Sequence, residues 1–93
     1  MTKSENTYTL LTIDAWKDTE GGWYWNDMHI VEEDIYIDPS LSNRALLAFM
    51  RRNHWLSEQS KGRIRIEDTG HDIEIQNKNT YEPIFAFRPQ WDM

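Results

Sequence analysis

The 93-residue sequence contains no cysteine and no long apolar run. A chain without thiols forms no disulfide, no thiolate metal site and no cysteine nucleophile. No apolar stretch approaches the roughly 18 residues of a membrane-spanning helix. The polar opening segment MTKSENT also lacks the apolar core of a secretion signal. We therefore expect a cytoplasmic protein that does not associate with a membrane.

Signatures of catalysis are missing as well. His29, His54 and His71 do not have the spacing of a zinc-hydrolase motif, and the chain has neither a G-x-S-x-G sequence nor a glycine-rich phosphate loop. Carboxylates are plentiful, but no pair stands out as a candidate for acid–base chemistry. We therefore expect a protein that is not an enzyme, with no catalytic residues, no metal and no cofactor.

The chain is rich in aromatic side chains and in acidic charge. Aromatic residues make up 13% of it, including five tryptophans, which is typical of a folded domain rather than a disordered chain. The length predicts one domain over residues 1–93, with residues 1–7 as a flexible N-terminus. The net charge of −6 is uneven, because residues 1–39 have nine acidic and two basic side chains, whereas residues 40–93 have a net charge of +1.

Alternating apolar and polar residues predict antiparallel strands, and one segment has a helical pattern. The strands are expected at residues 8–17, at 23–31 with a continuation at 35–37 past a bulge, and at 63–67, 72–76 and 84–87. The helix is expected to begin after the N-cap Ser42 and to fray near Asn53. This order, β-β-α-β-β-β, predicts an α+β fold in which an antiparallel sheet of about five strands carries one amphipathic helix on one face. A winged helix is the alternative, because the helix leads into an Arg-rich hairpin.

The acidic half of the chain contains the first candidate binding surface. Glu32, Glu33 and Asp34 are consecutive, and Asp27 is nearby. Closely spaced carboxylates suit a basic protein partner by electrostatic complementarity, and they can imitate the phosphate spacing of DNA. Charges on a solvated loop explain the same cluster without a partner.

Consecutive aromatic residues form the second candidate. In a strand, Trp23 and Trp25 point to one face and Tyr24 points to the other. Trp16 is expected to face one of these sides from across the hairpin, as part of a cross-strand cluster. Trp23 and Trp25 are interpreted either as core residues or as a protein-docking surface.

Basic residues interleaved with tryptophan form the third candidate, because they suit phosphate contact and base stacking. Arg44, Arg51 and Trp55 are expected on the outer face of the helix, with Arg52 on its flank. Arg63 and Arg65 are expected on the strand side opposite Ile64 and Ile66. The net charge of −6 disfavours a nucleic-acid partner. The candidate residues are Arg44, Arg51, Arg52, Trp55, Arg63 and Arg65.

Three segments, W-x-W-N-D, S-N-R-A-L-L-A-F-M-R-R-N and G-R-I-R-I-E-D, resemble small uncharacterised accessory proteins encoded by bacteriophages. The resemblance implies a compact protein that acts by binding in the cytoplasm of a bacterial host, and it carries over no site residue. We predict a non-enzymatic interaction protein that binds a host or viral protein, with a basic partner surface favoured. A nucleic-acid-binding module is the alternative, and self-association is left open.

Overall fold

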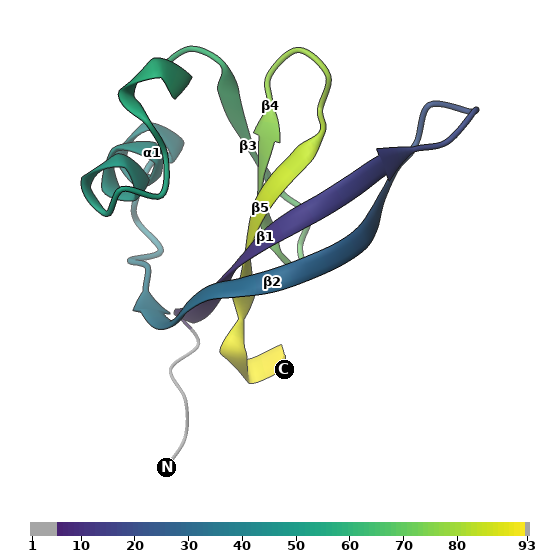
Figure 1. Cartoon of the computed structure of the whole chain (residues 1–93). Helices are drawn as coiled ribbons and strands as arrows, with labels where there is room; N and C mark the ends of the chain where they lie inside the picture. Colours follow the sequence, from purple (N-terminus) through teal and green to yellow (C-terminus); the bar gives the residue numbers. More distant parts are fainter. Residues whose placement is uncertain (1–5, 93) are drawn as a thin grey trace.

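The computed structural model describes residues 6–92, which form five strands, one α-helix and two short 3-10 helices (Figure 1). The predicted order β-β-α-β-β-β is confirmed. Of the N-terminal segment expected to be flexible, residues 1–5 lie outside the described residues, and Thr7 already belongs to the first strand. The elements are β1 (Thr7–Lys17), β2 (Trp23–Tyr36), α1 (Asn43–Arg52), a 3-10 helix (Glu58–Ser60), β3 (Ile64–Asp68), β4 (Ile73–Asn77), β5 (Pro83–Pro89) and a second 3-10 helix (Gln90–Asp92).

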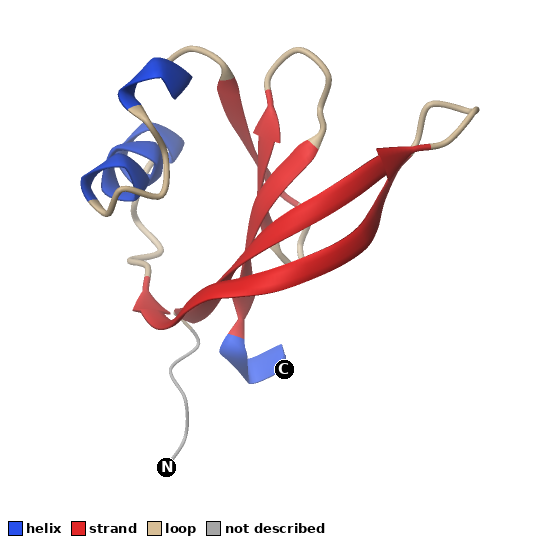
Figure 2. Cartoon of the chain, in the orientation of Figure 1, coloured by secondary structure: helices blue, strands red, loops and turns tan. Residues whose placement is uncertain are grey.

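The strands form one antiparallel sheet in the order β2-β1-β5-β4-β3 (Figure 2). β5 lies between β1 and β4, so the last strand joins the hairpin β1–β2 to the hairpin β3–β4. The winged-helix alternative is excluded, because residues 6–92 contain one α-helix and a helix-turn-helix needs two. No helix in this range is long and apolar enough to cross a lipid bilayer.

The hydrophobic core lies between α1 and one face of the sheet (Figure 1). Leu10 of β1 and Phe87 of β5 lie opposite each other and are fully buried, and they form one cluster with Leu46 and Met50 of α1. Four isoleucines alternate with polar residues along β3 and β4, and all of them belong to this cluster or pack against it: Ile64, Ile66, Ile73 and Ile75. The two layers are therefore held together by burial of both apolar faces.

The predicted start of α1 is confirmed. The Ser42 side chain accepts a 3.1 Å hydrogen bond from the backbone N–H of Ala45, which satisfies one of the free amides of the first turn. Arg51 and Arg52 lie in the last turn, where positive charge is favourable next to the free carbonyl groups.

The end of α1 corrects one prediction. His54 has a φ of +62°, and its N–H donates to the Arg51 carbonyl, while the N–H of Trp55 donates to the Met50 carbonyl, both at 3.0 Å. These two bonds define a Schellman motif, which turns the chain back toward the core. The Trp55 ring accordingly packs 5.7 Å from the ring of Phe49. The expectation that Trp55 lies on the outer helix face is wrong, because the helix ends at Arg52.

Removal of the core contact of α1 should destabilise the protein more than removal of its cap. We expect Leu46→Ala to lower the free energy of unfolding by about 2–5 kcal/mol, because it leaves a cavity. Ser42→Ala should cost about 0.5–2 kcal/mol through loss of the cap. Arg52→Ala is the exposed control, with an expected change below about 0.5 kcal/mol in urea unfolding. A larger loss for Arg52→Ala than for Leu46→Ala would contradict this packing.

Glycine at the end of α1 should stabilise the protein. The positive φ of His54 is costly for a residue with a Cβ and is free of that strain for glycine. We expect His54→Gly to raise the free energy of unfolding by about 1 kcal/mol. Urea unfolding measures the difference, and a loss of stability would show that the His54 side chain makes a stabilising contact.

Candidate functional site

The hairpin β1–β2 extends beyond the rest of the sheet as a two-stranded arm (Figure 1). β5 pairs with β1 from Tyr8 to Thr12, whereas β2 pairs with β1 as far as Lys17. The turn at residues 18–22, between β1 and β2, closes the arm. The carboxylate of Asp18 accepts hydrogen bonds from the backbone N–H groups of Glu20 and Gly22, at 3.0 and 2.8 Å. Within the described residues, the outer half of β1 therefore has β2 as its one strand neighbour.

β2 lies at the edge of the sheet, and every residue from position 26 to position 34 is exposed. Three of these residues are apolar: Met28 (40% exposed), Ile30 (56%) and Val31 (41%). Sequence reasoning missed this apolar group. Alternation predicts a strand with one apolar face, but it does not show which strand lies at the edge of the sheet.

The four carboxylates of the predicted acidic surface all belong to this strand and are exposed: Asp27, Glu32, Glu33 and Asp34. Asp27 lies opposite Asp14 of β1, and its Oδ2 is 3.3 Å from Nε2 of His29. The pairing of β1 with β2 shifts register between Tyr8 and Leu10, opposite Glu33 and Asp34, and Asp34 has a φ of +60°. The bulge expected between residues 23–31 and 35–37 is therefore confirmed, and it lies at Glu33 and Asp34.

The charge and the bulges restrict what can pair with the outer edge of β2. The register shifts between Leu10 and Leu11 and between Asp14 and Ala15 as well, so regular pairing is confined to short stretches. Bulges and charged side chains protect a sheet edge against pairing with copies of itself. Past the end of β2, hydrogen bonds from the backbone and side chain of Ser40 lower the pKa of the exposed carboxyl of Asp38 below its ordinary value.

Trp23 and Trp25 attach the arm to the sheet face that α1 leaves uncovered. The Trp25 ring lies 5.3 Å from the guanidinium carbon of Arg88. Nε of Arg88 is in turn 3.3 Å from Oδ1 of Asp72, whose side chain is 7% exposed. The indole N–H of Trp23 donates a 2.9 Å hydrogen bond to the Thr80 carbonyl in the β4–β5 loop. Both tryptophans are half-buried and lie outside the core cluster, and these contacts connect the arm to Arg88 and to the β4–β5 loop.

Trp16 and Tyr24 form the expected cross-strand cluster on the other face of the arm. They lie opposite each other in register, and their rings stack with centroids 5.1 Å apart. About half of each residue is exposed, 49% for Trp16 and 50% for Tyr24. The exposed aromatic surface of the arm is therefore this pair, rather than Trp23 and Trp25.

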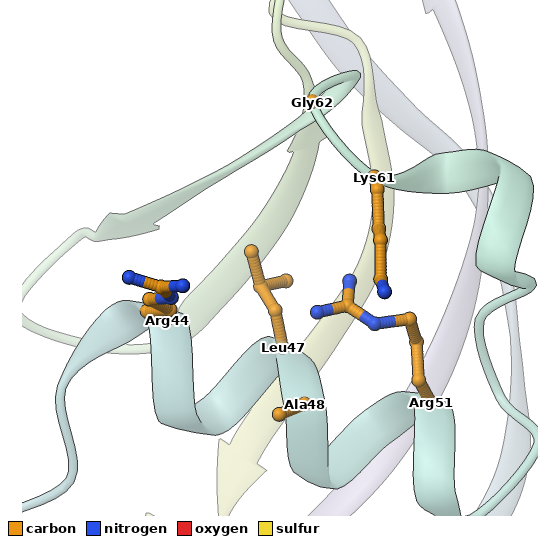
Figure 3. A pocket seen from close by; sticks show the side chains of 6 residues that line it. All are labelled: Arg44, Leu47, Ala48, Arg51, Lys61 and Gly62. Atoms are coloured by element: carbon orange, nitrogen blue, oxygen red, sulfur yellow. The ribbon is translucent and has the colours of Figure 1, made fainter.

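The candidate nucleic-acid residues are divided among separate parts of the molecule. Arg44 and Arg51 line a hollow beside α1 (Figure 3). Trp55 is half-buried and packs against the core, while Arg52 and Arg63 are exposed. The structure therefore places no exposed tryptophan from this set beside the arginines.

Arg65 lies on the sheet face opposite α1, as the alternation of β3 predicted. Its guanidinium donates hydrogen bonds to Gln76 and to Glu67, and it lies 4.9 Å from the Tyr81 ring. These contacts occupy Arg65 within the protein. Its charge is not available to join the arginines of α1.

Nothing in residues 6–92 forms a metal site, since no three His, Asp or Glu side chains in this range converge as ligands. Comparisons with protein-family models, with curated proteins and with solved structures found no match.

Loss of the indole donor of Trp23 should loosen the arm. Trp23→Phe keeps an aromatic ring but leaves the Thr80 carbonyl without this donor. We expect a loss of about 0.5–1.5 kcal/mol in unfolding free energy. Amide hydrogen exchange should be faster in residues 16–24 and unchanged in β4. Tyr24→Phe is the matched control on the same strand, and equal exchange rates in the two variants would contradict the anchoring role.

Proposed function

We propose that this protein is a non-enzymatic binding protein that docks a basic protein partner along the exposed edge strand β2. The observation that carries the proposal is the continuous exposure of residues 26–34, which include three apolar and four acidic side chains. The same strand therefore offers apolar area and negative charge side by side.

The two kinds of side chain have different roles in binding. Met28, Ile30 and Val31 supply affinity, because a partner that covers them removes apolar area from water at about 25 cal/mol per Å². The carboxylates supply selectivity and a fast encounter, because they attract a basic surface and repel an acidic one. The stacked pair Trp16 and Tyr24 extends the surface along the arm.

A second copy of this chain fits β2 poorly. The copy would bring its own Glu32, Glu33 and Asp34 to the same edge, and like charges opposed across a strand pair are destabilising. A basic partner meets no such repulsion. The resemblance to phage accessory proteins makes a bacterial or viral protein in the host cytoplasm the partner to seek.

The alternative of a nucleic-acid-binding module has less support. Single-strand binding needs exposed aromatic rings next to basic side chains. Trp55 is packed against Phe49, and Arg65 is bonded to Glu67, so neither is available for such a surface.

Charge reversal on β2 tests the proposal. The protein is immobilised, proteins of a bacterial lysate that it retains are identified, and association of the retained protein is measured at low and at high salt. Glu32→Lys/Glu33→Lys should lower the association rate about tenfold at low salt and change dissociation less. Asp34 is left unchanged, because its φ of +60° makes lysine strained there.

The matched control is Glu20→Lys/Glu82→Lys, which changes the net charge equally but lies outside β2. This control should retain at least half of the association rate. Circular dichroism verifies that both variants fold. An equal decrease in both variants would show an effect of net charge alone, and an association rate independent of salt would contradict an electrostatic surface.

A further inference from the structure

A hollow of about 610 Å³ lies beside the outer face of α1 (Figure 3). Its volume is within the range of small-molecule sites, roughly 300–1,000 Å³. The chain contributes to it from α1 and from the turn before β3. The lining residues are Arg44, Leu47, Ala48, Arg51, Lys61 and Gly62.

The helical repeat places the α1 residues of the hollow on one side. Arg44, Leu47, Ala48 and Arg51 are spaced by three, four and seven positions, so they follow one another along the same face. Gly62 has a φ of +78°, a conformation that favours glycine and that turns the chain from the 3-10 helix into β3. Figure 3 shows the side chains of Lys61 and Arg51 directed toward each other, with Leu47 beside them.

The hollow has more positive charge than the protein itself neutralises. Nζ of Lys61 is 2.9 Å from Oε2 of Glu58. The hydrogen bond and charge of Lys61, together with the charge of Arg51, lower the pKa of Glu58. Within residues 6–92, no ion pair or hydrogen bond joins the side chain of Arg44 or Arg51 to another side chain. The carboxylate of Glu58 therefore lies near Lys61 and Arg51, and three cations line the hollow.

We propose that this hollow binds a compact oligophosphate, such as the diphosphate or triphosphate group of a small molecule. Guanidinium groups hold phosphate oxygens through paired hydrogen bonds, and a lysine adds a point charge. The apolar atoms of Leu47 and Ala48 offer contact to the remainder of such a molecule. The site shares no residue with β2, so it stands independently of the proposed docking function.

The charge distribution favours a small anion over a long one. The whole chain has a net charge of −6, which opposes a polyanion that extends across its surface. At physiological salt, exposed charges act over about 8 Å, so a compact ligand experiences mainly the three cations around it. A nucleic-acid strand would also meet the acidic remainder of the surface.

Calorimetric titration of the full-length protein with sodium pyrophosphate and with sodium tripolyphosphate tests the assignment. We expect one site per chain, with tighter binding of tripolyphosphate and weaker binding as salt rises. Arg51→Gln and Arg44→Gln should each weaken binding about tenfold or more, because each removes a charge-assisted contact. Amide chemical shifts should change in residues 44–51 and 61–62.

Arg52→Gln is the matched control, since it removes the same charge from the same helix but does not line the hollow. It should change the affinity by less than about twofold. Thermal unfolding verifies that the variants fold. The proposal fails if neither phosphate binds at millimolar concentration, if Arg52→Gln weakens binding as much as Arg51→Gln, or if citrate binds as tightly as tripolyphosphate. Tighter binding of an oligothymidine than of tripolyphosphate would also overturn it, in favour of nucleic acid.

Discussion

The pairing of β1 with β5 is the interaction on which the rest of the structure depends. It joins the two ends of the chain, and it combines two local hairpins into a single sheet. Leu10 and Phe87 lie opposite each other in this pair and are fully buried beneath Leu46 and Met50 of α1. Without it, neither hairpin would have enough covered area to be stable alone, because an isolated two-stranded hairpin is marginal in water.

The limited length of that pairing explains the arm. β5 covers β1 only from Tyr8 to Thr12, so the outer half of the first hairpin projects as two strands. Contacts on the uncovered sheet face compensate for the missing neighbour, through Trp23 on the Thr80 carbonyl and Trp25 on Arg88. The outer edge of β2 is exposed for a separate reason, because β2 is the first strand in the order β2-β1-β5-β4-β3.

The two candidate sites have opposite charge. The exposed strand β2 is acidic, whereas the hollow beside α1 contains three cations and one neighbouring carboxylate. The net charge of the whole protein predicts the charge of neither site. Salt screens the interaction between distant exposed charges, so each site is governed by the charged side chains close to it. A protein with a net charge of −6 can therefore offer one surface for a basic partner and another for a small anion.

The sequence by itself determined the features that arise from neighbouring residues. The cap Ser42, the two hairpins, the isoleucine face of β3 and β4, and the acidic cluster all follow from patterns a few residues long. Tertiary structure alone decided that β2 is an edge strand of the sheet and that Trp55 packs against the core. It also decided that the arginines of the candidate nucleic-acid surface lie on different parts of the molecule. These outcomes depend on the position of β5 between β1 and β4 and on the residue at which α1 ends. Contacts between residues as distant in sequence as Thr9 and Arg88 leave no local pattern in the chain, so sequence patterns do not predict them.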